Sequence, residues 1–383
     1  MTSRLKTQMR GTRPWAWKVS DVFRPMLVIM TLEDPTLLWP LASDPMLSVM
    51  TNLSQPPIAP AGAACPSGAD AQHPNDVFGR LFRACEGLPA VRCAVVHPCD
   101  ADSLGGAMAA AQRGLIEPVL VGPQAKIRAV AQEGGWDLSP WRIVDTEHSH
   151  AAADTAVALA RAGEVQALMK GSLHTDELMG AVVASATGLR TARRVSHVFV
   201  MDVPAYPRML LVTDAAVNIA PTVREKADIV QNAIELAHVL GVPEPKVAIL
   251  AAVETVNPDM QATVDAAMLC KMADRGQITG GLIDGPLAFD NAVNLEAART
   301  KHIVSPVAGQ ADILVVPDIE AGNMLAKQLQ YLAGADSAGI VLGTRVPIVL
   351  TSRADSVRMR LASTAVLKLL AHARTQSKAI VAA

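Results

Sequence analysis

From residue 75 onward, short runs of apolar residues alternate with longer stretches in which apolar residues recur at helical spacing. The short runs, such as residues 91–96, 119–122 and 247–250, have the length of buried strands. Helical stretches such as residues 102–113 lie between them. Because parallel strands are joined by helical crossovers, this alternation predicts an α/β fold with helices on both faces of a parallel sheet.

The composition excludes several classes of protein. The chain has 383 residues and a formal net charge of −2, so it lacks the excess positive charge that holds a nucleic-acid backbone. Aromatic residues make up 3% of the chain, which is too few for platforms on which bases stack. No apolar run approaches the roughly 20 residues that span a bilayer. We expect no nucleic-acid partner, no membrane association and a cytoplasmic location.

Side chains that bind metals are few in the sequence. The five cysteines form no Cys-x-x-Cys pair and no cluster with histidine at the spacing of zinc ligands. Asp284 and Asp290 are six residues apart, but no third ligand accompanies them. A turn followed by a helix cap explains this pair equally well. We therefore expect no metal site.

Residues 1–75 differ from the rest of the chain. They contain three of the five tryptophans, many prolines and no sustained helical or alternating pattern. The proline and glycine residues within 55–62 are typical of a linker. We expect a poorly ordered N-terminal extension, or a start codon assigned too early, in place of a catalytic domain.

A first polar cluster follows the predicted strand 165–169. It contains Lys170, Ser172, His174 and Thr175. A lysine beside hydroxyl groups at the start of a helix suits phosphate binding, although a capped surface loop has the same residues. Ligands of parallel sheets bind beyond the carboxyl ends of the strands, which is where this cluster is expected.

A second polar cluster lies where the predicted strand 346–350 leads into the last helix, which is expected to end near residue 372. It contains Ser352, Arg353 and Asp355. The arginine can hold a phosphate or a developing oxyanion and the carboxylate can accept a proton, which suits acyl transfer. Helix capping by the serine or the aspartate is the alternative.

A basic patch lies between these two clusters in the sequence. Residues 188–194 contain three arginines, including Arg190. Arginine binds phosphate through two parallel hydrogen bonds, so the patch can hold a phosphorylated ligand, or it can form a solvated face. From spacing alone, the chain is an α/β enzyme with an anionic ligand.

Several long motifs resemble those of the phosphate acetyltransferase/phosphate butyryltransferase family. They are residues 168–179, 213–221, 266–278, 284–291, 320–329 and 350–356. The resemblance covers residues 73–373 and is closest to the transferase half of bifunctional enoyl-CoA hydratase/phosphate acetyltransferase proteins. It implies a reversible reaction in which acyl-CoA and phosphate give acyl phosphate and CoA, for a short acyl group such as acetyl or butyryl. Coenzyme A is then a substrate, and no cofactor is bound.

The resemblance also implies an architecture. It is that of isocitrate and isopropylmalate dehydrogenases, with two α/β domains, a cleft between them and a homodimer. The first domain would comprise residues 76–192 plus 339–383 and carry the CoA and phosphate site. The second, residues 193–338, would form the dimer contact.

Site residues follow from the same resemblance. In the acetyltransferases a Ser-Arg pair near the C-terminus orients the thiol and phosphoryl groups, and Ser352 and Arg353 match it. The general base of the acetyltransferases corresponds to Met359 here, whereas Asp355 resembles the acid of the butyryltransferases, so the acyl group is left unnamed. An arginine of the acetyltransferases is absent near Gly180. The expected substrate-binding residues are Lys170, Ser172, His174, Thr175, Arg190 and Asn323.

Two other functions are compatible with such a scaffold. One is a catalytically weak acyl-CoA-binding protein of the same fold. The other is a dehydrogenase, which would need metal-binding carboxylates and a nucleotide-binding loop that the sequence does not display.

Overall fold

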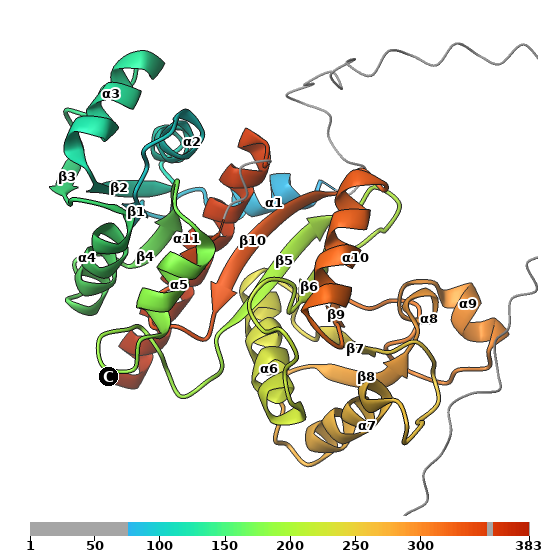
Figure 1. Cartoon of the computed structure of the whole chain (residues 1–383). Coiled ribbons are helices and arrows are strands. Elements are labelled where there is room, and N and C mark those ends of the chain that lie inside the picture. The colour runs from blue at the N-terminus through green and yellow to red at the C-terminus, as the bar shows by residue number, and fades with distance from the viewer. Residues whose placement is uncertain (1–75, 351–354, 383) are drawn as a thin grey trace, which may run out of the picture. The chain divides into compact units, whose positions relative to one another are not determined.

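The computed structural model describes residues 76–350 and 355–382. They lie within one compact unit, and their strands form a single sheet of eleven strands (Figure 1). The segment 1–75, expected to be a poorly ordered extension, lies outside the described residues, and so do Ser352 and Arg353.

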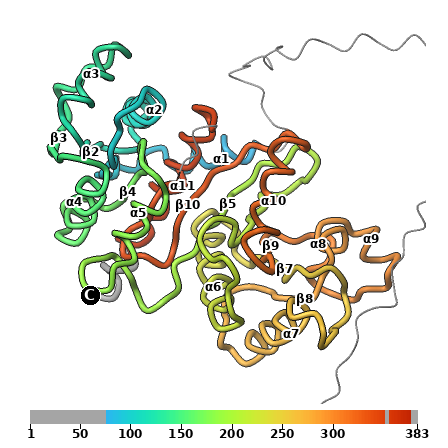
Figure 2. Tube along the Cα trace, viewed as in Figure 1, coloured from blue at the N-terminus to red at the C-terminus, as the bar shows by residue number. Residues whose placement is uncertain are grey.

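The order of the strands in the sheet differs from their order in the chain. Across the sheet they are β3 (Arg142–Asp145), β2 (Ile116–Gly122), β1 (Val91–Val96), β4 (Ala167–Lys170), β11 (Ile348–Val349), β10 (Asp336–Leu342), β5 (Ser196–Asp202), β6 (Leu210–Thr213), β9 (Ile313–Val315), β7 (Lys246–Leu250) and β8 (Leu282–Leu287). Figure 2 shows β5 and β10, which are far apart in the sequence, running side by side.

The sheet is mixed, which corrects the prediction of a parallel sheet. Neighbouring strands are parallel at both ends, but β10 is antiparallel to both β11 and β5, and β5 is antiparallel to β6. The connection between β5 and β6 is short, and a short connection joins antiparallel strands, whereas a parallel pair needs a crossover of a dozen or more residues.

The helices cover both faces of this sheet. They are α1 (Val77–Ala84), α2 (Ala101–Gln112), α3 (Gln124–Gly134), α4 (Ser149–Arg161), α5 (Thr175–Val183), α6 (Val223–Val239), α7 (Gln261–Asp274), α8 (Phe289–Val293), α9 (Leu295–Thr300), α10 (Ile319–Tyr331) and α11 (Val357–Ala382). Successive residues of a strand point to opposite faces, so Val95 packs with α2 and α11 in one core cluster and Val96 with α4 and α5 in another. In the part of the chain that the structure describes, no helix is long and apolar enough to cross a membrane.

Two local predictions differ from the structure. The last helix was expected to end near residue 372, but α11 continues to Ala382. Asp284 was expected in a turn, but it lies within β8, and its carboxylate accepts a hydrogen bond from the amide of Gly285. Since β8 is the last strand of the sheet, Pro286 can occupy it without removing a hydrogen bond from a central ladder.

The strand order determines where the polar clusters lie. The chain moves from β1 outward to β2 and β3 and then returns to β4 on the other side of β1, so the order reverses next to Lys170. Ligands of α/β sheets bind at such reversals, beyond the carboxyl ends of the strands. The predicted domain 193–338 contains β5 to β9, which are neighbours at one end of the sheet. Its separation from the other residues stays a prediction.

Candidate substrate cavity

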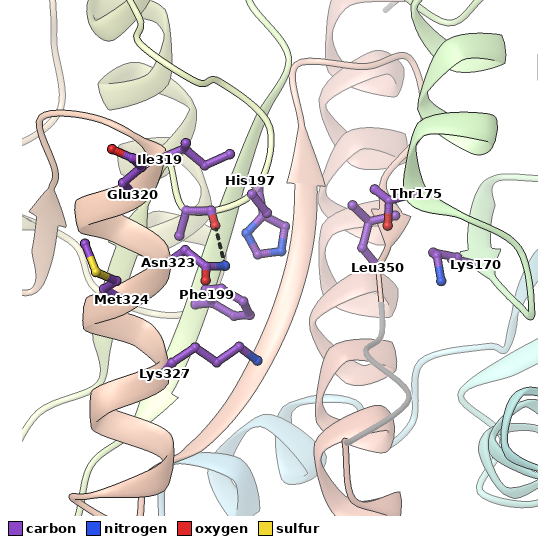
Figure 3. Close-up of a pocket in the computed structure, with 12 residues that line it drawn as sticks. Lys170, Thr175, His197, Phe199, Ile319, Glu320, Asn323, Met324, Lys327 and Leu350 are labelled. Carbon is purple, nitrogen blue, oxygen red and sulfur yellow. Dashed lines mark hydrogen bonds between the residues drawn. The ribbon is translucent and has the colours of Figure 1, made fainter.

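A cavity of about 810 Å³ lies among the carboxyl end of β4, the strand β5 and the helix α10 (Figure 3). Its lining residues come from strands, loops and helices that are distant in the sequence. They are Lys170, Thr175, His197, Phe199, Ala215, Ala216, Ile319, Glu320, Asn323, Met324, Lys327 and Leu350. A cavity of this size, with a mixed apolar and charged lining, is typical of a site for a small molecule.

Two lysines lie on opposite sides of this cavity (Figure 3). Lys170 is the half-buried last residue of β4, and its Nζ donates to the carbonyl oxygen of Gly171 at 3.3 Å. Lys327 extends from α10 on the opposite wall, with its Nζ 3.4 Å from Oε1 of Gln330 and 5.8 Å from the centre of the Tyr331 ring (Figure 3). Among the described lining residues Glu320 is the one carboxylate, so this part of the lining has a net positive charge that favours an anionic ligand.

The floor of the cavity is formed by two rings from β5. His197 is 1% exposed, and its ring meets the Phe199 ring edge-on, with centroids 4.5 Å apart and planes at 75°. Burial lowers the pKa of the His197 imidazole to about 4, although the nearby Asp214 carboxylate acts in the opposite direction. The ring is therefore neutral at pH 7. Its Nδ1 has no hydrogen-bond partner among the residues that the structure describes.

A buried aspartate holds the turn that carries Ala215 and Ala216. The Asp214 carboxylate accepts hydrogen bonds from the backbone amides of His197, Ala216, Val217 and Asn218 at 2.9–3.3 Å. It also accepts from Nδ2 of Asn218 at 2.6 Å. Because one carboxylate binds both β5 and the turn after β6, it fixes two walls of the cavity relative to each other.

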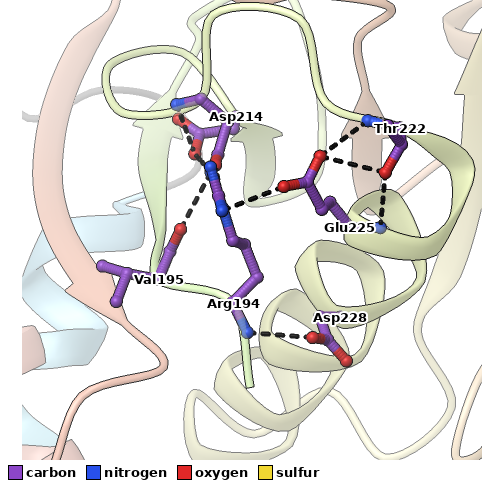
Figure 4. Close-up of polar contacts among 7 residues, drawn as sticks. Arg194, Val195, Asp214, Thr222, Glu225 and Asp228 are labelled. Atoms are coloured by element: carbon purple, nitrogen blue, oxygen red, sulfur yellow. Dashed lines mark hydrogen bonds and ion pairs between the residues drawn. The ribbon is translucent and has the colours of Figure 1, made fainter. Parts of the chain in front are cut away.

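An arginine connects this turn to the start of α6 (Figure 4). The Nε atom of Arg194 donates to Oδ1 of Asn218 at 2.7 Å, and its Nη1 lies 2.9 Å from the Glu225 carboxylate. Glu225 also forms a capping box with Thr222: the Thr222 hydroxyl accepts from the Glu225 amide at 3.4 Å, and the Glu225 carboxylate accepts from the Thr222 amide at 2.9 Å. Hydrogen bonds from Thr222 lower the pKa of the Glu225 carboxyl, so it stays charged beside the arginine.

The sequence of the chain matches a protein-family model. Residues 147–367 match the sequence model of the phosphate acetyl/butaryl transferases, a range that includes all twelve lining residues. The chain belongs to this family. The resemblance read from the motifs is thus confirmed, while its link to the bifunctional hydratase proteins stays a prediction.

Individual relatives cover most of the described part. The chain is 63% identical to a phosphate acetyltransferase of Rhizobium meliloti over 297 residues, which is 78% of this chain and 94% of the relative. It is 40% identical to a phosphate butyryltransferase of Clostridium beijerinckii over 294 residues, or 77% and 97% of the two chains. Its fold is similar to the crystal structure of a branched-chain phosphotransacylase from Enterococcus faecalis, with a TM-score of 0.65, 32% identity, and coverage of 74% of this chain and 99% of that one.

Three of the predicted substrate-binding residues line the cavity of this family member. They are Lys170, Thr175, which is the first residue of α5, and Asn323 on α10. The Asn323 side chain donates to the carbonyl oxygen of Ala215 at 3.3 Å and so connects α10 to the turn after β6.

The other predicted substrate-binding residues lie elsewhere. The Ser172 hydroxyl donates to the carbonyl oxygen of His97 at 2.8 Å and accepts from the Cys99 amide at 3.0 Å, so it joins the loops after β4 and β1. His174 is the exposed N-cap of α5. Arg190 is exposed and does not line the cavity. Their contact with substrate stays a prediction.

The predicted catalytic cluster is described in part. Asp355 lines a smaller cavity of about 270 Å³, together with Tyr331, Asp336 and Ser356, and does not line the larger one. Its backbone oxygen accepts from Nε of Arg360 at 3.1 Å. Leu350, two residues before Ser352 in the sequence, lines the larger cavity. The roles of the serine, the arginine and the aspartate stay predictions.

Among the described residues, no group of three or more His, Cys, Asp or Glu side chains could hold a metal ion.

Sequence reasoning did not find His197, Phe199 or Lys327. The two rings lie in the mostly apolar stretch 195–201, where the signal available was a histidine inside an apolar run. Lys327 lies in the family motif 320–329, but no helix was predicted there.

Gly339 of β10 provides the space that the His197 ring occupies. A Cβ atom at this position would be 2.9 Å from Nε2 of His197 and 3.3 Å from the carbonyl oxygen of Leu350. We expect Gly339→Ala to displace the ring and to lower the free energy of unfolding by about 1–3 kcal/mol, as overpacking does. Urea denaturation measures the change. Gly180→Ala on α5 is the matched control, because nothing lies within 4 Å of its added Cβ, and equal stability of the two variants would contradict the expectation.

Proposed function

We propose that this chain catalyses the reversible transfer of a short acyl group between CoA and phosphate, and that the cavity of Lys170 and Lys327 holds the reacting groups. Membership of the phosphate acetyl/butyryl transferase family supports the reaction. The two lysines on opposite walls carry the assignment of the site, because phosphate, acyl phosphate and CoA are all anions.

The chemistry needs a thiolate, a stabilised oxyanion and a leaving phosphate. The CoA thiol is mostly protonated at neutral pH, so a carboxylate that takes its proton speeds the attack on the acyl carbonyl of acyl phosphate. As the C–S bond forms, the carbonyl oxygen becomes negative, and a cation or hydrogen-bond donor stabilises it. The tetrahedral intermediate then expels phosphate and leaves acyl-CoA.

The chain has candidates for each of these tasks. Lys170 and Lys327 would hold the phosphoryl group. By the family pattern, Ser352 and Arg353 would orient the thiol and the phosphoryl group, and Asp355 would accept the thiol proton. The cleft between two domains, the dehydrogenase-like architecture, the homodimer and the cytoplasmic location belong to the same proposal and derive from the resemblance and the composition.

An assay on the purified chain tests the reaction. We expect it to form acyl-CoA from CoA and at least one of acetyl, propionyl and butyryl phosphate, with equal rates in the presence and absence of a chelator. The product is measured by its thioester absorbance. Tight CoA binding by calorimetry without any thioester formation would instead identify a non-catalytic acyl-CoA-binding protein, and the proposal would be wrong.

A further inference from the structure

The floor of the cavity contains an aromatic pair, His197 and Phe199, which the reaction alone does not require. His197 and Phe199 are two residues apart on β5, so their side chains emerge on the same face of the sheet, toward α10. Figure 3 shows the Phe199 ring below the His197 ring, between the side chains of α10 and Leu350. The cavity is thus closed on this side by an aromatic ring.

The Phe199 ring is held in place by its neighbours. The His197 ring contacts it at 4.5 Å in the edge-to-face geometry that aromatic pairs prefer. Gly339, the residue of β10 paired with Phe199, leaves the room in which the His197 ring lies. The other part of Phe199 packs against the core cluster that contains Met201 and Ala326. A ring fixed on two sides acts as a wall, whereas a freely rotating side chain would give way.

The lysines and the Phe199 ring of the lining come from different elements, β4 and α10 for the lysines and β5 for the ring. The anions of the reaction require the lysines of the two side walls, whereas the acyl chain requires apolar surface. Phe199 is the one apolar aromatic side chain among the described lining residues, and the residues of the adjacent turn, Ala215 and Ala216, are small. Met324, by contrast, is 59% exposed at the outer side of α10. The larger apolar side chains that are half-buried in the described lining are Phe199, Ile319 and Leu350, and Phe199 is the bulkiest of them.

We propose that Phe199, held by the ring of His197, closes the acyl end of the cavity and limits the length of the acyl chain that the enzyme transfers. This inference rests on the proposed function. The substrate class it addresses is the series of straight-chain acyl phosphates, in which each member adds one methylene group. A pocket that loses or gains space for one methylene changes relative kcat/KM by about 10–200-fold.

The test compares kcat/KM for acetyl, propionyl, butyryl and valeryl phosphate between the unchanged enzyme and two variants. We expect Phe199→Ala to raise the ratio of the longer to the shorter substrates at least tenfold, and Phe199→Leu to raise it less. Phe199→Leu keeps most of the packing, so it gives the answer even if the alanine variant unfolds. Phe289→Ala is the matched control, since Phe289 is 41% exposed at the start of α8 and does not line the cavity.

Each outcome has a distinct meaning. A shift of the ratio in the Phe199 variants, with none in Phe289→Ala, supports the inference. An equal loss of kcat/KM for all four substrates, or an unchanged ratio in folded variants, overturns it while the proposed function stands. An unchanged enzyme that transfers no acyl group at all defeats the proposed function itself, and the inference with it.

Discussion

Replacing Lys226 by methionine is expected to lower the free energy of unfolding by about 3–5 kcal/mol, because it leaves a buried carboxylate without its partner. Lys226 of α6 and Asp265 of α7 form an ion pair in which Nζ and Oδ2 are 2.7 Å apart, and both side chains are 6% exposed. The other carboxylate oxygen accepts from Nε2 of Gln261 at 2.7 Å. Urea denaturation followed by circular dichroism measures the loss.

An exposed ion pair on α7, the helix that carries Asp265, provides the control. Nζ of Lys271 and Oδ2 of Asp274 are 2.6 Å apart, but their side chains are 66% and 61% exposed. The Lys271→Met variant removes the same charge, yet surface pairs contribute at most about 1 kcal/mol. The double variant Lys226→Met/Asp265→Leu should regain most of the lost stability, since no buried charge remains. Similar unfolding midpoints for Lys226→Met and Lys271→Met would show that the buried pair is unimportant.

The strands that could be predicted are those whose burial leaves a simple pattern. Residues 247–250 form a continuous apolar run, and residues 91–96 are apolar except for the exposed Arg92, because helices cover both faces of the sheet there. Strands β1 and β7 lie at these positions. Strand β8 could not be found in this way. It contains Asp284, Gly285 and Pro286, which are residues typical of turns, and the edge of a sheet accommodates them.

The direction of the central strands depends on contacts that the sequence does not display. After β5 the chain forms β6 to β9 at one end of the sheet, and only then returns to form β10, which pairs with β5 in the antiparallel sense. Local hydrophobic patterns are the same for parallel and antiparallel neighbours when both faces are buried. The strands were therefore predictable, but their pairing in the middle of the sheet was not.

The candidate site was predictable where a polar residue ends a strand. Lys170 ends β4, Thr175 begins the helix that follows, and both line the cavity. His197 and Phe199 do not follow that rule, because they lie inside a buried strand, and a sequence does not indicate which face of such a strand borders a cavity. Asp355 illustrates the opposite difficulty: its position beside the predicted pair is clear in the sequence, but the residue lines the smaller cavity.

The largest expected effect on catalysis belongs to Lys170. We expect Lys170→Met to lower kcat/KM for acyl phosphate at least 100-fold, because a donor that stabilises the negative charge developing in the transition state contributes about 10²–10³ to the rate. If the lysine binds substrate and transition state equally, KM rises while kcat stays constant; if it acts on the developing charge, kcat falls. Initial rates over a range of acyl phosphate and CoA concentrations separate the two cases.

Charge and position can be separated with two further variants. Lys170→Arg keeps the cation at the end of β4, so we expect it to retain more activity than Lys170→Met, although a planar guanidinium does not reproduce the geometry of an ammonium group. Lys271→Met removes one positive charge from an exposed part of α7, outside the lining of the cavity, and should leave kcat/KM within twofold of the unchanged enzyme. If the Lys170→Met enzyme is folded and as active as Lys271→Met, the phosphoryl group is bound elsewhere. The loss of the cation at the end of β4 must weaken the binding of any anion in this cavity.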